Sequence, residues 1–151
     1  MKEAYIPELQ TVSYTRARKW DYVLTSDLPV ITPWELGNHD FRDEFGNVWL
    51  ETRGKLLVVK SGYAWDGASC APDFKDVILA SCVHDSLCQF RDVVCFPLSK
   101  AQIDKVFRDL MPYRFLARWI YWGAVRAFGG VYAAAVPAAK AGSCGLPHDR
   151  H

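Results

Sequence analysis

The stretch "KLLVVKSGYAWDGASCAPDFKDVILASCVHDSLCQF", residues 55–90, contains the change from strand to helix on which the fold depends. Its first part, "KLLVVKSGY", is the best strand candidate in the chain. A turn with Asp66, Gly67 and Pro72 follows. After it, apolar or small residues recur at a spacing typical of a helix up to Phe90: Val77, Ala80, Ser81, His84, Leu87 and Cys88. We therefore expect a strand, a turn and a helix in this order.

Strand and turn signals dominate the chain before this stretch. The segment "DYVLTSDLPVI" (21–31) has strand-forming residues interrupted by Asp27 and Pro29. The segment "DEFGNVWLE" (43–51) contains the turn signal Gly46-Asn47. These patterns predict a small β region over about residues 14–65.

Two further helices are expected after Phe90. The segment "SKAQ" (99–102) is a capping box with Ser99 as N-cap, and the helix it begins must end near Pro112. The apolar stripe of that helix is Ile103, Val106, Phe107, Leu110 and Met111. A third helix is expected over about Phe115 to Phe128, with a buried side that contains Phe115, Trp119, Trp122 and Val125. The sequence thus predicts an α+β fold, in which a three-helix part over about residues 73–130 follows the β region.

Length and composition indicate one domain. The chain has 151 residues, of which 50% are hydrophobic, so it can bury a single sizeable core. We expect this domain to cover residues 1–134 and the tail, residues 135–151, to be irregular. The formal net charge is +1, from 18 basic and 17 acidic residues, which argues against a nucleic-acid partner.

Two segments bear on export and membrane insertion. Residues Met1 to Gln10 contain no uninterrupted apolar run, so we expect no secretory signal and synthesis in the cytoplasm. The segment "WIYWGAVRAFGGVYAAAVPAA" (119–139) is long enough to span a membrane, but Arg126, Pro137 and two glycines interrupt it. Its first half is amphipathic. We expect a core helix that ends near Gly129, and no transmembrane span.

The cysteines give no metal or redox motif. There are five of them and none forms a C-x-x-C pair, which argues against a zinc knuckle. They are Cys70, Cys82, Cys88, Cys95 and Cys144. We expect small buried thiols.

His84 is the candidate general base. It lies on the stripe of the predicted helix 77–90 that packs against another helix, where a carboxylate would orient its imidazole. Asp104 lies at the margin of the apolar stripe of the next helix. If the two helices pack antiparallel, Asp104 reaches the His84 ring. We therefore expect His84 and Asp104 to form a catalytic pair.

Asp66 and Asp85 are the candidate metal ligands. Asp85 follows His84 directly and points about 100° away from it, so we expect the two side chains to have separate roles. Two carboxylates and the backbone carbonyl of Gly67 are hard oxygen ligands, which suit Ca²⁺. In this hypothesis His84 takes a proton from water, and the ion stabilises negative charge on a carbonyl oxygen.

Other interpretations of the same residues stay open. Taken one at a time, His84 is also typical of a buried core histidine, Asp85 of a solvated carboxylate and Asp66 of a capping aspartate. His39, followed by His84-Asp85 and Asp104, matches the residue order of HD-type metal phosphohydrolases, but those enzymes are all helical and His39 lies in a β-rich stretch. The tryptophans of the first half would form either an aromatic interaction surface or ordinary core packing: Trp20, Trp34, Trp49 and Trp65.

Four segments resemble, in the same order and at similar spacing, the motifs of bacterial and fungal secreted phospholipases A2. They are "AWDGASCAPD", "ILASCVHDSLCQF", "SKAQIDKVFRDLM" and "IYWGAVRAFGG". The resemblance implies a phospholipase A2-like core of antiparallel helices and calcium-dependent hydrolysis of lipid esters. It assigns Asp66 and Gly67 to a calcium loop, Asp85 to the second carboxylate ligand, His84 to the base and Asp104 to its partner.

The chain from about Tyr22 to Gly130 also resembles a family from tailed bacteriophages and prophages, the domain-of-unknown-function family thirteen-fifty-three. The residues that carry this resemblance are "DGASCAP", "VHD" and "QID". It implies a phage-derived protein that is made in the host cytoplasm and is a candidate component of the virion.

The chain departs from both families at Cys88, where they have a tyrosine, so one hydrogen-bonding support of the site is missing. Cys70 and Cys82 are displaced from the ends of the disulfide that holds the calcium loop in secreted phospholipases, which leaves a pair between them as a possibility. Two functions follow. One is a hydrolase acting on phospholipid or the cell envelope, and the other is a non-catalytic tail or baseplate module that binds phage structural proteins.

Overall fold

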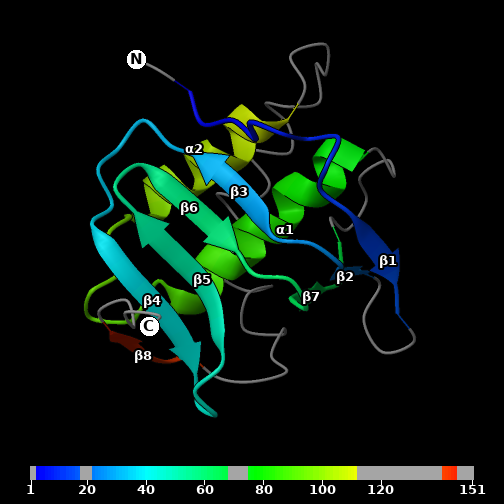
Figure 1. Cartoon of the computed structure of the whole chain (residues 1–151). Helices are drawn as coiled ribbons and strands as arrows, with labels where there is room; N and C mark the ends of the chain where they lie inside the picture. Colours follow the sequence, from blue (N-terminus) through cyan, green and yellow to red (C-terminus); the bar gives the residue numbers. More distant parts are fainter. Residues whose placement is uncertain (1–2, 18–21, 68–74, 112–140, 146–151) are drawn as a thin grey trace.

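The computed structural model describes residues 3–17, 22–67, 75–111 and 141–145. Within these ranges, eight strands form two antiparallel sheets and two helices lie against the larger sheet. Figure 1 shows the larger sheet in front and both helices behind it. The fold therefore has a sheet layer and a helix layer, with the small sheet at one end.

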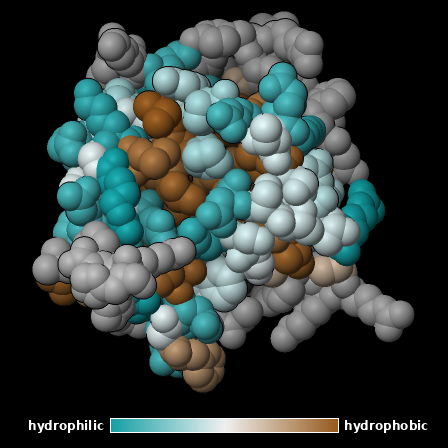
Figure 2. Space-filling view, viewed as in Figure 1, coloured by the Kyte–Doolittle hydropathy of each residue, from teal (hydrophilic) through white to brown (hydrophobic). Residues whose placement is uncertain are grey.

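The larger sheet has five strands in the order β3-β6-β5-β4-β8. Their bounds are β3 Leu28–Ile31, β4 Asn38–Asp43, β5 Val48–Arg53, β6 Leu56–Val59 and β8 Ala141–Gly145. Buried and half-buried residues alternate along β3 and β6, as expected for strands with one face on a core. On the opposite face, seen in Figure 2, apolar side chains gather among polar ones, and alternate residues of these strands are only partly buried there: Pro29, Ile31, Leu56 and Val58.

The turn between β4 and β5 shows how local chemistry sets a hairpin. Gly46 has a positive φ of 88°, as the predicted turn at Gly46-Asn47 requires. The Asp43 carboxylate accepts hydrogen bonds from the backbone N–H groups of Phe45 and Asn47, each at 2.9 Å. It also accepts from Asn47 Nδ2 at 2.9 Å and from Trp49 Nε1 at 2.8 Å. One buried carboxylate thus accepts four hydrogen bonds from the turn and from Trp49.

The smaller sheet contains β1 Tyr14–Arg16, β2 Tyr22–Leu24 and β7 Ala64–Trp65, in the order β1-β2-β7. Trp65 is fully buried and packs against the ring of Tyr22. Its indole Nε1 donates a hydrogen bond to Ser81 Oγ in α1, at 3.1 Å. This contact fixes the start of the Asp66 turn against the helix layer.

The two helices are α1 Lys75–Phe90 and α2 Lys100–Leu110. The predictions for both are confirmed: α1 covers the expected stretch, and α2 begins with the capping box of Ser99 and Gln102. All five residues of the predicted α2 stripe are buried. The helices run in opposite directions side by side in Figure 1, and α1 is buried on most of its circumference. Helix α1 is therefore the central element of the core.

The expected fold class is wrong. The sequence predicted a small β region followed by a three-helix, phospholipase A2-like core. The described residues are instead mostly β: they form a three-stranded sheet, a five-stranded sheet and only two helices. The reason is that strands of two to six residues carry weak sequence patterns, while helical periodicity is easy to detect. The third expected helix, 115–128, lies outside the described residues. Part of the tail expected to be irregular, Ala141–Gly145, is strand β8 at the edge of the larger sheet.

Among the described helices, neither is long and apolar enough to cross a membrane. The segment 119–139, for which a core helix was expected, lies outside the part of the chain that the structure describes.

Candidate functional site

His84 and Asp104 meet between the two helices. His84 Nε2 lies 3.2 Å from Asp104 Oδ1, and both residues are buried. The ring of Phe107 packs beside the imidazole, with its centroid 5.2 Å away. The antiparallel packing of the two apolar stripes produces this contact, as the sequence led us to expect.

Lys100 is a third member of this group, and the sequence analysis missed it. Its Nζ lies 2.9 Å from Asp104 Oδ2 and 3.2 Å from Oδ1. Burial alone would raise the pKa of Asp104, but hydrogen bonds from His84 and Lys100, together with the charge of Lys100, lower it. Asp104 is therefore an ionised carboxylate shared by two cations. The signal was present in the sequence, because residues four apart on a helix are neighbours.

The pKa of His84 reflects several neighbours at once. Burial by itself would lower it, but Asp104, Asp85 and Cys88 outweigh burial and raise it well above its ordinary value. His84 Nδ1 lies 3.7 Å from Asp85 Oδ1, and Cys88 Sγ lies 3.6 Å from Nε2. The expectation that His84 and Asp85 would have no direct relation is therefore wrong, because the Asp85 side chain bends back toward the ring.

Asp85 and Asp66 form an acidic pair at the end of the Asp66 turn. The Asp85 side chain is 28% exposed, and burial together with the nearby charge of Asp66 raises its pKa in spite of His84. Gly67 has a positive φ of 77°, and a Cβ there would lie 2.8 Å from the Tyr22 ring. A carboxylate whose pKa is raised by a neighbouring carboxylate, next to a backbone that only glycine fits, suits a cation with oxygen ligands. The next part of the turn, residues 68–74, lies outside the described residues.

Tyr63 also belongs to this group and was not found from the sequence. It is buried, and its hydroxyl donates to Gln89 Oε1 in α1 at 3.0 Å. Burial raises its pKa well above the ordinary value, and the charges of Asp85, Cys82 and Cys88 raise it further. The available sequence signal was the position of Tyr63 at the end of the expected strand "KLLVVKSGY", three residues before Asp66.

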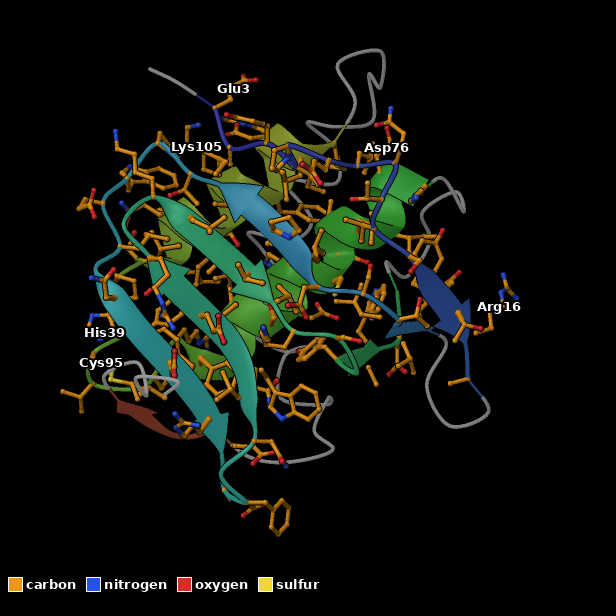
Figure 3. The ribbon with its side chains drawn as sticks, in the orientation of Figure 1. Glu3, Arg16, His39, Asp76, Cys95 and Lys105 are labelled. Carbon is orange, nitrogen blue, oxygen red and sulfur yellow. A yellow bond between two sulfur atoms is a disulfide. The ribbon has the colours of Figure 1, made fainter. Side chains whose placement is uncertain are left out.

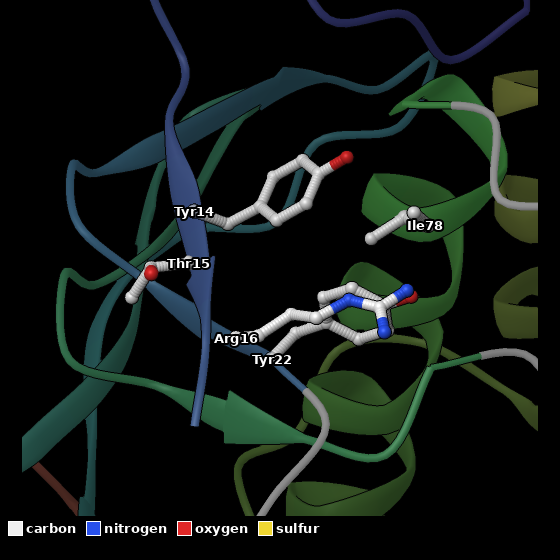
Figure 4. A pocket seen from close by; sticks show the side chains of 5 residues that line it. All are labelled: Tyr14, Thr15, Arg16, Tyr22 and Ile78. Atoms are coloured by element: carbon white, nitrogen blue, oxygen red, sulfur yellow. The ribbon is translucent and has the colours of Figure 1, made fainter. Parts of the chain in front are cut away.

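A cavity of about 460 Å³ lies between β1, β2 and α1 (Figure 4). It is lined by Tyr14, Thr15, Arg16, Tyr22 and Ile78. The Arg16 guanidinium lies 5.7 Å from the centroid of the Tyr22 ring, the same ring that Gly67 approaches. The cavity is thus aromatic and apolar with one cationic side chain, and it shares a wall with the turn.

His39 does not join His84. It lies on β4, and among the described residues its metal-ligand neighbours are Cys95 and Cys144. The arrangement expected for an HD-type phosphohydrolase is therefore absent from this part of the chain. Cys82 and Cys88 are buried free thiols. Cys70 itself lies outside the described residues.

The tryptophans of the first half do not gather into one exposed surface. Trp65 is fully buried, and Trp34 and Trp49 are partly buried against the core. Ordinary packing accounts for all three, and Trp20 lies outside the described residues.

Comparison with protein-family models, curated proteins and solved structures finds no match to this chain. The fold and the geometry of His84, Asp104, Asp85 and Asp66 are therefore the basis for a functional proposal.

Proposed function

We propose that this protein is a phage-derived, calcium-dependent ester hydrolase that acts on phospholipid. The observation that carries the proposal is the buried contact of His84 Nε2 with Asp104 Oδ1 at 3.2 Å. The residue after His84 is Asp85, whose pKa is raised by burial and by the charge of Asp66. A histidine oriented by a buried carboxylate is an arrangement suited to general-base chemistry.

The position of Asp104 favours one tautomer of the histidine. An ionised carboxylate can only accept hydrogen bonds, so in neutral His84 Nε2 carries the hydrogen and donates a hydrogen bond to Asp104, and the lone pair lies on Nδ1. In the proposed reaction, His84 acts in its neutral form, which becomes more populated as the pH rises because the pKa of the ring is raised. It takes a proton from water at Nδ1 while the water oxygen attacks the ester carbonyl. The ester C–O bond then breaks, and the leaving alcohol takes the proton from His84. The products are a carboxylic acid and an alcohol, and no serine or cysteine nucleophile is needed.

Asp66, Asp85 and the Gly67 carbonyl would hold the calcium ion. Bound there, the ion would stabilise the negative charge that develops on the carbonyl oxygen. The cavity lined by Tyr14, Tyr22 and Ile78 would receive an apolar chain of the substrate, since it lies against the same turn.

A second function is a non-catalytic tail or baseplate module that retains the helix pair as a scaffold. Cys88 favours it, because a thiol 3.6 Å from His84 Nε2 stands where the resembling families have a tyrosine. In that case Asp104 would hold the two helices together through its contact with His84, without any reaction.

Fatty-acid release from phosphatidylethanolamine–phosphatidylglycerol vesicles, with and without Ca²⁺, separates the two functions. For the hydrolase we expect His84→Asn and Asp104→Asn to lower the rate by roughly 10²–10⁴-fold. Asp109→Asn is the matched control. Asp109 is also buried in α2 and paired with a lysine four residues earlier, Lys105, but it contacts the backbone N–H of Ala4 instead of His84. Equal release by the parent and His84→Asn would leave the scaffold function.

Calcium binding is tested by calorimetry and by the thermal midpoint of unfolding. A ligand that binds only the native state raises that midpoint. We expect both signals for the parent protein and neither for an Asp66→Asn, Asp85→Asn double variant. Absence of both signals in the parent would remove the calcium site from the proposal.

A further inference from the structure

A group of three metal-ligand side chains lies at the β8 edge of the larger sheet, apart from the helix pair. The ligand atoms of His39, Cys95 and Cys144 all lie within 4.8 Å of one another, and all three residues are half-buried. Figure 3 shows His39 and Cys95 next to each other at this edge. The proposed hydrolase uses none of these residues.

Sheet register and a linker bring the three residues together. Cys144 on β8 is paired with Phe41 on β4, so their side chains share a face, and His39 lies two residues from Phe41 on the same face. Cys95 belongs to the linker between α1 and α2, and its neighbour Phe96 packs edge-on against Phe41 with ring centroids 5.5 Å apart. The group therefore joins three segments that are remote in sequence.

The His39 ring is also held in place from its own strand. Gly37 has a φ of 71°, and a Cβ there would lie 3.0 Å from His39 Nε2. The absence of a side chain at Gly37 leaves room for the ring beside the two sulfur atoms.

Cys95 and Cys144 have two chemical states. The structure gives them as a disulfide with Cα atoms 6.4 Å apart. As thiols, the same two sulfur atoms and the imidazole of His39 offer one nitrogen and two sulfur ligands, the set that zinc prefers. The sulfur atoms need to separate to about 3.8 Å around a tetrahedral ion, which side-chain rotation at these half-buried positions allows.

We propose that, with its cysteines reduced, this protein binds one Zn²⁺ ion through His39, Cys95 and Cys144. Each thiol loses a proton on binding, and the fourth tetrahedral position is left to water. The ion would link β8 and the α1–α2 linker to β4. Hydrogen peroxide reverses the state: it takes two electrons from the two thiolates and two protons from solvent and leaves as two water molecules, the disulfide forms, and the ion is released.

The test uses the full chain without an affinity tag, reduced with a phosphine and then freed of it under nitrogen. We expect one Zn²⁺ per chain by elemental analysis, and thiolate-to-metal charge-transfer bands together with tetrahedral d–d bands when Co²⁺ replaces it. His39→Asn should weaken zinc binding by more than about tenfold, since loss of even an outer-shell partner has an effect of that order. Cys144→Ser should abolish the thiolate bands expected from two sulfur ligands.

Two control variants separate this site from other histidines. His84→Asn removes the candidate base, and His148→Asn, His151→Asn removes the histidines at the end of the chain. We expect both to bind zinc as the parent does. The proposal is overturned if the reduced parent binds no zinc, if His39→Asn binds it equally well, or if only the terminal double variant loses it. The proposed calcium site is tested with variants of Asp66 and Asp85, and the zinc site with variants of His39 and Cys144. A negative result for one site therefore leaves the other proposal standing.

The thermal midpoint of unfolding gives a second readout. If Cys95 and Cys144 only formed a disulfide and bound no metal, zinc would not change this midpoint. Zinc should raise the midpoint of the reduced parent but not that of reduced His39→Asn. In the oxidised protein, zinc should leave the midpoint of both unchanged. An equal rise in both reduced proteins would contradict the assignment of His39 as a ligand.

Discussion

Asp104 is the residue on which the candidate site depends most, because it balances two cations from two helices. Its carboxylate contacts His84 across the helix pair and Lys100 along its own helix. The side chain is completely buried, so neither contact can be replaced by water without opening the core.

Replacement of Asp104 by alanine should lower the free energy of unfolding by about 3–5 kcal/mol, because it leaves the buried His84 ring without its carboxylate partner. Urea unfolding followed by circular dichroism measures this change. Asp92→Ala is the control, since that side chain is 92% exposed and its replacement should change stability by less than about 0.5 kcal/mol. If Asp104→Ala lowered the free energy of unfolding as little as Asp92→Ala does, the contacts of Asp104 with His84 and Lys100 would contribute little to stability.

Gly67 and Gly46 allow a comparison of steric contact at similar backbone conformations. Both have positive φ, at 77° and 88°, but a Cβ at Gly67 would lie 2.8 Å from the Tyr22 ring, whereas a Cβ at Gly46 meets nothing within 4 Å. We expect Gly46→Ala to cost about 1 kcal/mol from the backbone alone, and Gly67→Ala to cost more. Chemical unfolding of both variants measures the difference. Equal costs would mean that the Tyr22 ring moves aside freely.

Among the elements, the β4–β5 hairpin depends on one carboxylate. Desolvation by burial would raise the pKa of Asp43, but its hydrogen bonds with Asn47, Trp49 and Phe45 outweigh it and lower the pKa. A pKa that is lower in the folded state stabilises the fold above the unfolded pKa. This contribution is lost as the pH falls through the folded pKa.

Asp43→Asn should therefore lower the free energy of unfolding by about 1–3 kcal/mol at neutral pH, where the parent carboxylate is ionised. The difference between parent and variant should begin to shrink as the pH falls below about 4, where Asp43 is protonated in the unfolded state, and should be lost below the lower folded pKa, where it is protonated in both states. Urea unfolding at a series of pH values measures it. A difference that is independent of pH would assign the effect to packing of the turn instead of to the charge.

Helix α1 connects the parts of the fold. It contacts α2 through His84, the small sheet through Ser81 and Trp65, and the larger sheet through Phe90 and Phe41. Strand β1, in contrast, has half-buried and exposed residues only and pairs with a single strand, β2. Local stability should differ accordingly between these elements.

We expect the amide hydrogens in the middle of α1 to exchange only through global unfolding, and those of β1 to exchange by local opening. Hydrogen exchange followed by mass spectrometry, with and without mild denaturant, measures both. Protection of β1 equal to that of α1 would mean that the small sheet is as firmly attached as the helix layer.

Local sequence patterns predicted part of this architecture and part of the site. The capping box at Ser99 and the stripes of Leu87 and Val106 identify both described helices, since helix ends and helical periodicity are encoded within a few residues. The same patterns placed Asp104 within reach of His84. Lys100 carries an equally local signal, since it lies four residues before Asp104 on the same helix.

By itself, then, the sequence determined where the helices begin and end and which of their faces are buried, because these depend on local hydrogen bonds and on a period of 3.6 residues. Only the tertiary structure decided the strand order, the position of β8 beside β4, and the meeting of His39 with Cys95 and Cys144. Pairing between strands joins residues that are far apart in the chain, and short strands carry no local signal of their partner.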